Sequence, residues 1–199
     1  IKHLTVSEMQ AVLDAPVPTD REGIRDRAML HLCFAAGLRV SELIGLQLSD
    51  LKLQPDASIR VLGKGRKERC LPLWKQTATA LRAWMAVRGE MPCANLFVNA
   101  RGQAMTRSGF EYILSKHAKQ AAVDCPSLAQ KRISPHVLRH TCALTVLQAT
   151  NDLRKVSLWL GHASIQTTEI YTRTDPSVKL EALQSMVAPE LRKGRFKAT

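Results

Sequence analysis

The feature that most constrains this fold is a change of hydrophobic spacing at residues 51–73. Before and after this stretch, apolar residues recur every three or four positions, which is typical of amphipathic helices. Within it they form three short runs with strand-like spacing: Leu51 and Leu53, then Ile59 and Val61, then Cys70, Leu71 and Leu73. Residues 63–67, Gly-Lys-Gly-Arg-Lys, separate the second run from the third and predict a turn. We therefore expect an α+β fold, mostly helical, with a small antiparallel sheet of three strands.

Helix start and stop signals divide the rest of the chain. Thr5 and Glu8 have capping-box spacing ahead of a helix that should end before Pro16. Ser134 followed by Pro135 predicts an N-cap with proline at the first position of a helix that runs to residue 150. Further helical segments are expected over residues 20–36, 38–44, 75–88, 106–121 and 152–161, in a short helix from residue 164 or 167 that holds residue 171, and over residues 178–187.

The charge of the chain indicates the class of its partner. Lys and Arg number 29 against 17 Asp and Glu, which gives a formal net charge of +12. An excess of this size predicts a polyanionic partner, most simply nucleic acid, although an anionic membrane or solubility alone also fits the charge. The longest uncharged apolar run, residues 28–38, is too short to span a bilayer, and the first residues lack the apolar region of a signal peptide. We therefore expect no membrane partner.

The cysteines bear on the cellular setting. All five are scattered, and none forms a Cys-x-x-Cys pair, which argues against a disulfide framework and against a zinc knuckle. A reducing, cytoplasmic setting is predicted. The chain begins with Ile rather than Met, so we expect it to be a piece of a longer protein.

One helix presents an unusual group of cations. His136, Arg139 and His140 fall at positions i, i+3 and i+4, on one face of the helix that begins at Ser134. Together with the partial positive charge of the helix N-terminus they predict an anion site, against the alternative of a solvated polar face. A zinc site is disfavoured because Val137 stands where a His-Glu-x-x-His helix has its glutamate, and because Arg139 would repel a dication.

Two other features have a competing interpretation. Residues 63–67 do not match a Walker phosphate loop, since a strand follows them, so a hairpin turn with solvated lysines remains the alternative to a DNA contact. Of the two tyrosines, Tyr112 lies among Phe110, Ile113 and Leu114 and is expected to be a packing residue with its hydroxyl at an edge. Tyr171 lies in a polar segment that a core explains less easily.

Four strings occur together in the chain: Ala-Gly-Leu-Arg-Val-Ser-Glu-Leu at 36–43, Leu-Gly-Lys-Gly-Arg-Lys at 62–67, His-Val-Leu-Arg-His-Thr at 136–141 and Leu-Gly-His-Ala-Ser-Ile-Gln-Thr-Thr-Glu-Ile-Tyr at 160–171. In this order and spacing the chain resembles the tyrosine recombinases, also called phage integrases. The resemblance implies their catalytic-domain fold, shared with type IB topoisomerases, over residues 1–174. It also implies that the N-terminal core-binding domain of the family is absent from this chain.

The resemblance implies a role for each matching residue. Arg39 and Arg139 would hold the non-bridging oxygens of the scissile phosphate, and His136 and His162 would complete that pocket. Glu42 would support Arg39, as its i+3 spacing allows.

The remaining matches concern the proton, the nucleophile and the DNA backbone. Lys64 would be the general acid for the leaving 5′ oxygen, and Tyr171 would be the nucleophile that forms a 3′-phosphotyrosine. His140 is a further supporting residue. The expected contacts to DNA phosphates are Arg66, Lys67, Arg107, Lys131 and Arg132. No metal, ATP or other cofactor is implied.

The implied enzyme is a site-specific DNA recombinase, a DNA strand transferase that acts on double-stranded DNA as a homotetramer on two duplexes. Residues 175–199, a C-terminal helix and basic tail, would contact a neighbouring subunit, although the tail could also pack on its own domain. A type IB topoisomerase that nicks and reseals one strand is the alternative enzyme. A non-catalytic DNA-binding protein is a further alternative.

Overall fold

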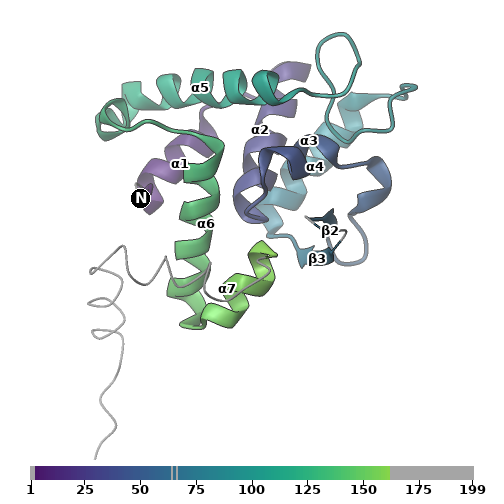
Figure 1. Ribbon diagram of the computed structural model, residues 1–199. Helices are drawn as coiled ribbons and strands as arrows, with labels where there is room; N and C mark the ends of the chain where they lie inside the picture. Colours follow the sequence, from purple (N-terminus) through teal and green to yellow (C-terminus); the bar gives the residue numbers. More distant parts are fainter. Residues whose placement is uncertain (1–2, 64, 66, 162–199) are drawn as a thin grey trace, which may run out of the picture.

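The computed structural model describes residues 3–63, 65 and 67–161, and it confirms a mostly helical fold with one small antiparallel sheet (Figure 1). The α-helices are α1 (Val6–Asp14), α2 (Arg21–Ala35), α3 (Val40–Gly45), α4 (Lys75–Arg88), α5 (Arg107–Asp124), α6 (Pro135–Thr150) and α7 (Leu153–Leu160). Two short 3-10 helices, η1 (Leu48–Asp50) and η3 (Pro126–Gln130), connect them. Within the described part of the chain, no helix is long and apolar enough to cross a membrane.

The helix caps predicted at Thr5 and Ser134 are present in the structure. Glu8 accepts a hydrogen bond from the backbone N–H of Thr5 at 2.8 Å, and the Thr5 hydroxyl accepts from the N–H of Glu8 at 3.2 Å, which completes the capping box of α1. The Ser134 hydroxyl accepts from the N–H of Val137 at 3.4 Å at the start of α6. These bonds satisfy N–H groups that have no partner within the helix.

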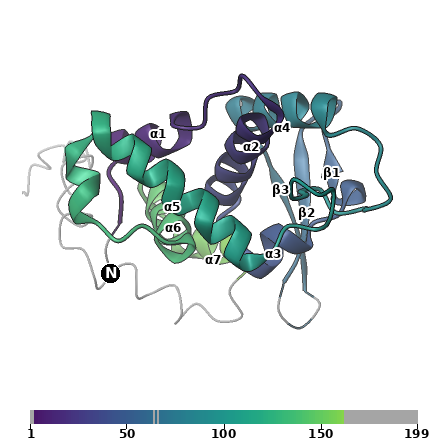
Figure 2. The ribbon, with the colours of Figure 1, turned by 90° about the horizontal axis from the view of Figure 1, so that it is seen from above.

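The sheet has the order β1 (Leu51–Lys52), β2 (Ser58–Leu62), β3 (Glu68–Pro72), with both pairs antiparallel (Figure 2). The turn predicted at residues 63–67 joins β2 to β3, and the N–H of Gly63 donates to the carbonyl of Lys67 at 2.8 Å. Ile59 and Leu71 face each other across the ladder on the buried side. Side chains alternate between two faces in a strand, so only one face of this sheet contributes to the core.

Helix α2 lies at the centre of the domain and packs against α1, α4 and α6, while α5 crosses α1 and α3 (Figures 1 and 2). The core holds the fully buried side chains of Met29, Trp84, Phe97 and Phe110, and the indole N–H of Trp84 donates to the carbonyl of Leu96 at 2.9 Å. A buried indole needs such a partner because an unpaired donor in the core is destabilising.

A buried polar network joins α2 to α5. One oxygen of Asp26 accepts two hydrogen bonds from Arg25, at 2.7 and 2.9 Å, and the other lies 2.8 Å from Nε2 of His117. All three side chains are buried. A charge buried in a core is tolerated when it is paired in this way. The contact between Asp26 and His117 links α2 to α5.

Gly37 makes the sharp turn that follows α2. Its φ is +56°, and a Cβ at this position would lie 2.5 Å from Cδ2 of Leu160 and 3.1 Å from Sγ of Cys142. Both the backbone conformation and the close approach therefore require glycine. Burial raises the pKa of the Cys33 and Cys142 thiols to about 12, so these two core residues stay protonated. All five cysteines are free.

The expectation that Tyr112 is a packing residue with only its hydroxyl at an edge is wrong, because the residue is 71% exposed. The buried stripe of α5 begins with Phe110, Ile113, Leu114 and His117, spaced i, i+3, i+4 and i+7, and continues with Ala118 and Ala121. Position 112 lies off this stripe, on the solvent side of the helix. The helix also extends to Asp124, three residues beyond the expected end.

Candidate active site

The site is organised around one carboxylate, that of Glu42 at the third position of α3. Arg39 caps the start of this helix, and its backbone N–H donates to Oε2 of Glu42 at 2.9 Å. Nη1 of Arg39 donates to Oε1 of Glu42, also at 2.9 Å, which confirms the expected i+3 pair. Glu42 is buried, whereas the Arg39 side chain is 40% exposed. Glu42 thus holds both the backbone and the guanidinium of Arg39, while the side chain remains accessible to solvent.

Arg139, in the second turn of α6, joins the same cluster. Its Nη1 donates to the carbonyl of Gly37 and lies 3.9 Å from Oε2 of Glu42, and its Nη2 donates to the carbonyl of Leu160 at 2.8 Å. These contacts tie the turn after α2 and the end of α7 to α6. The structure therefore brings Arg139 to Arg39 and Glu42, which lie far from it in the sequence.

A third arginine, absent from the predicted site, completes the cluster. Arg69 of β3 donates to both oxygens of Glu42, from Nη1 to Oε1 at 3.1 Å and from Nη2 to Oε2 at 2.9 Å. Its side chain is only 9% exposed. The sequence contains one signal for it: Arg69 alternates with the buried Leu71, and so takes an inward position in a strand.

These partners decide the ionisation of Glu42. Burial alone would raise the pKa of this carboxyl, but the hydrogen bonds from Arg69 and from the Arg39 backbone, with the charges of Arg69 and Arg139, lower it below its ordinary 4.5. Glu42 is therefore an anion at neutral pH. Three guanidinium groups surround this one negative charge, which leaves the cluster with an excess of two positive charges.

The two predicted histidines of α6 lie in different environments. His136 is exposed in the first turn, as a residue that meets a ligand should be. His140 is buried, and its ring lies 6.4 Å from that of His3, near the N-terminal segment. The alternative of a solvated polar face is wrong for Arg139 and His140, since both are buried.

The predicted DNA-contacting residues divide into exposed and internally paired ones. Lys67 and Arg132 are exposed, as is Arg107, whose side chain is 67% exposed and lies 3.9 Å from Glu111. Lys131 instead forms an ion pair with Glu8 at 2.6 Å. The predicted site residues Lys64, Arg66, His162 and Tyr171 lie outside the described residues.

No three His, Cys, Asp or Glu side chains are grouped so as to hold a metal ion in the described parts of the chain, residues 3–63, 65 and 67–161. Of the predicted site residues in these ranges, the structure brings Arg39, Glu42 and Arg139 together, with Arg69 as a fourth member of the cluster. Guanidinium groups hold anions such as phosphate, so this arrangement suits an anionic ligand.

Comparison with known proteins decides the family. The model of the phage integrase family matches residues 2–177. The chain belongs to the phage integrase family. Tyrosine recombinase XerC of Corynebacterium glutamicum is 43% identical over 183 residues, and XerD of Halalkalibacterium halodurans is 42% identical over 176. The matches cover 89% and 86% of this integrase-family chain but 56% of each relative, so the chain spans little more than half of their length.

Solved structures agree with the family assignment. The crystal structure of XerA recombinase matches with a TM-score of 0.80 at 32% identity, over 92% of this chain and 64% of that one. XerH site-specific recombinase, in a post-cleavage complex with a palindromic difH substrate, matches with a TM-score of 0.74 at 28% identity, over 92% of this chain and 53% of that one. The resemblance to tyrosine recombinases seen in the sequence is confirmed.

Proposed function

We propose that this chain is the catalytic part of a site-specific recombinase that cuts and rejoins double-stranded DNA through a 3′-phosphotyrosine. The observation that carries the proposal is the convergence of Arg39 and Arg139 on Glu42, within a family whose similar members are named recombinases. In this function the cluster binds the scissile phosphate.

The excess charge of the cluster suits this chemistry. A phosphodiester gains negative charge on its equatorial oxygens as the nucleophile attacks. Arg39 has one hydrogen bond to Glu42 from its side chain, and no other partner of its guanidinium lies among the residues that the structure describes. It can therefore donate to a phosphate without giving up its support. Preorganised donors of this kind contribute about 10²–10³ each in rate.

The other roles rest on the sequence. Tyr171 is the nucleophile and Lys64 the general acid, with His162 in the phosphate pocket. At pH 7 a tyrosine with its usual pKa of ~10 is ionised in about 1 part in 1,000, which costs ~4 kcal/mol. Nearby cations and an imidazole lower this cost. His136 is exposed in the first turn of α6, at the positive end of a helix, and this position supports a role for it in the phosphate pocket. The phosphotyrosine keeps the energy of the broken phosphodiester for the attack of a second 5′-hydroxyl.

Covalent trapping tests the catalytic assignment. The chain is incubated with a nicked duplex of a cognate-like site, and the products are resolved on a denaturing gel. Wild type and Tyr171→Phe are compared with Tyr112→Phe, a matched control because Tyr112 is exposed and is the only other tyrosine of the chain. We expect an adduct from wild type and Tyr112→Phe, and none from Tyr171→Phe. An adduct from Tyr171→Phe, or DNA binding by wild type without an adduct, would refute the proposal.

Strand exchange between two sites separates a recombinase from a topoisomerase. Site-specific exchange supports the recombinase, whereas relaxation of any supercoiled plasmid without exchange supports a type IB topoisomerase.

Exposed cations support binding to the DNA backbone. Lys67, Arg107 and Arg132 are solvent-accessible, whereas Lys131 is held by Glu8. We expect Arg107→Gln to weaken binding to all sequences and to reduce the slope of log affinity against log salt by about 1, because one counterion fewer is released. Lys131→Gln should leave this slope unchanged. The opposite result would assign the contact to Lys131.

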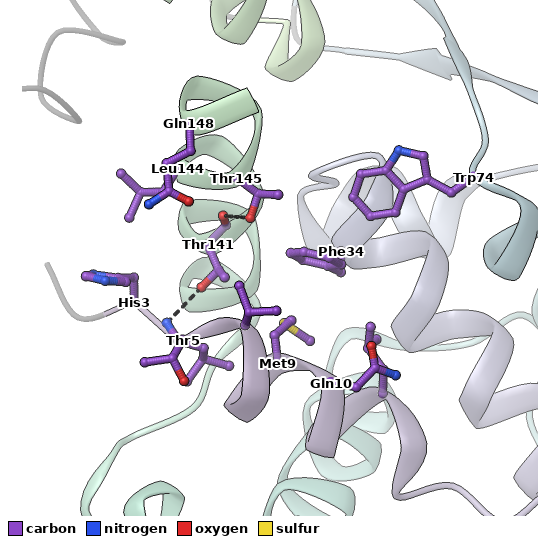
Figure 3. A pocket seen from close by; sticks show the side chains of 13 residues that line it. His3, Thr5, Met9, Gln10, Phe34, Trp74, Thr141, Leu144, Thr145 and Gln148 are labelled. Carbon is purple, nitrogen blue, oxygen red and sulfur yellow. Dashed lines mark hydrogen bonds between the residues drawn. The ribbon is translucent and has the colours of Figure 1, made fainter. Parts of the chain in front are cut away.

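We further propose that residues 178–187 of one subunit dock on a neighbour in a homotetramer on two duplexes. Two pockets of about 460 and 570 Å³ share Trp74 and Thr145 in their linings. Figure 3 shows the first, with Phe34 and Trp74 across from Thr141, Thr145 and Gln148 of α6. The second, between β3 and α7, is bordered by Leu158, which is 74% exposed.

The chemistry of the tail fits the second pocket, whose lining includes the apolar side chains of Leu71, Leu158 and Trp159. Leu180, Leu183 and Val187 are spaced i, i+3 and i+7, so a helix over residues 178–187 would be about 15 Å long with one apolar face. Residues 161–174 connect the tail to α7, which borders the second pocket.

A mixing experiment tests docking between subunits. Leu158→Glu should prevent a subunit from receiving a tail, and deletion of residues 175–199 should prevent it from donating one. If tails dock on neighbours, neither variant alone assembles on DNA, and a mixture forms dimers through one intact interface. If either variant alone assembles as wild type does, docking at the second pocket is refuted. Failure of the mixture to assemble would indicate that the tail packs within one chain.

The cytoplasmic setting remains a prediction, supported by the five free cysteines.

A further inference from the structure

Arg69 is the least expected charge in the domain. In the β2–β3 ladder it pairs with Val61, which is fully buried, so its side chain starts from the face that Ile59 and Leu71 also use to reach the core. Cys70, which follows Arg69 in β3, and Arg60, which pairs with Cys70 across the ladder, point to the solvent side, where a charge is usual. An arginine at an inward position is costly to bury unless it is paired.

Glu42, the partner of Arg69, has all its acceptor positions filled by Arg69 and Arg39 together. The Glu42 carboxylate accepts four hydrogen bonds: two from the Arg69 fork, one from Nη1 of Arg39 and one from the Arg39 backbone. A carboxylate has about four acceptor positions, so no further donor is needed to satisfy it. The orientation of Glu42, and through it that of Arg39, is therefore set jointly by β3 and by α3.

Arg69 also touches segments that lead to other predicted site residues. A Cβ on Gly161 would lie 2.9 Å from Nη1 of Arg69, and one on Gly63 would lie 3.5 Å from it. Gly161 ends α7 and directly precedes His162 in the sequence, and Gly63 directly precedes Lys64. Any side chain at position 161 would displace the guanidinium.

We propose that Arg69 is a positioning residue for the cleavage reaction and that it acts through Glu42. Its charge balances that of Glu42, so that Arg39 and Arg139 keep their full positive charge for the phosphate. Its fork fixes the carboxylate in the rotation that holds Arg39. The inference rests on the proposed function, because Arg69 acts only through a cluster that binds the scissile phosphate. It assigns to Arg69 no contact with DNA.

The test compares Arg69→Gln and Arg69→Lys with Arg60→Gln. Arg60 lies on the neighbouring strand, is 49% exposed and carries the same charge, so it controls for the loss of one cation from the sheet. Three quantities are measured for each chain: the urea midpoint of unfolding, the Kd for the nicked duplex, and the single-turnover rate of adduct formation at saturating protein.

The reasoning predicts a loss of rate without a matching loss of affinity. Arg69→Gln should slow adduct formation about 100-fold and change Kd less than about threefold, because the lost effect appears in the transition state. Arg69→Lys keeps the charge but has no fork, and should slow it about tenfold. Arg60→Gln should match wild type in rate. If Arg69→Gln is unfolded at the assay temperature, Arg69→Lys carries the comparison.

A modified substrate distinguishes positioning from general damage. A methylphosphonate at the scissile position replaces one charged oxygen with a methyl group, so the positive charge of Arg39 and Arg139 matters less. The rate ratio of wild type to Arg69→Gln should then fall from about 100 to below about 10. An equal ratio on both substrates, or a rate for Arg69→Lys within about threefold of wild type, would overturn the inference. Absence of an adduct from wild type would overturn both it and the proposed function.

Discussion

The substitution Glu42→Gln tests the central claim about the site, that one buried carboxylate holds three arginines. Glutamine has nearly the same shape but no charge, so Arg69, which is 9% exposed, and Arg139, which is 6% exposed, lose their counter-ion. Removing one partner of a buried ion pair costs about 3–5 kcal/mol, since the remaining charge is left buried and uncompensated. For a domain of this size we therefore expect Tm to fall by about 6–20 °C.

The assay is thermal and urea unfolding of Glu42→Gln beside Asp50→Asn. Asp50 also pairs with an arginine, Arg60, at 3.0 Å, but that partner is 49% exposed, and exposed pairs contribute only about 0–1 kcal/mol. High salt should not remove the difference between the two variants, because buried pairs are weakly screened. A loss for Glu42→Gln of less than about 1 kcal/mol, or equal to that of Asp50→Asn, would refute the reasoning.

The pH dependence has a defined sign. The pKa of Glu42 is lower in the folded chain than its ordinary 4.5, so the unfolded chain binds more protons in the acid range. The stabilisation by Glu42 is therefore complete above about pH 4.5 and declines as the pH falls below it. Glu42→Gln should lack this part of the acid sensitivity, and an unchanged pH profile would contradict the assignment.

Three further predictions concern the rest of the domain. Gly37→Ala should destabilise by about 2–5 kcal/mol through a positive φ and a clash, whereas Gly45→Ala, with nothing within 4 Å of its Cβ, should change stability by less than about 1 kcal/mol in urea unfolding. Burial lowers the pKa of His31 to about 4, so stability should fall as the pH drops from 6.5 to 4, and His31→Gln should flatten this part of the profile. Lys131→Gln should cost about 1–3 kcal/mol at pH 7, where Glu8, whose pKa is lowered to about 2, is charged; equal midpoints would show that the pair contributes nothing.

Local patterns were enough to predict most of the elements. The capping box of Thr5 and the Ser134–Pro135 start each place a helix end, because a cap depends on residues within one turn. The strand runs predicted the sheet and the hairpin turn. Tyr112 was placed wrongly because its apolar neighbours are close in sequence but lie on another face of α5.

The sequence by itself determined the family, the helices and sheet, and the i+3 pair of Arg39 with Glu42, since each depends on short-range spacing or on strings of residues. Only the tertiary structure decided that Arg69 and Arg139 share that carboxylate, and that Lys131 belongs to Glu8 rather than to an open surface. These pairs join residues that are far apart in the chain. Which buried charges meet depends on how α3, α6 and β3 pack, and packing is a property of the whole core.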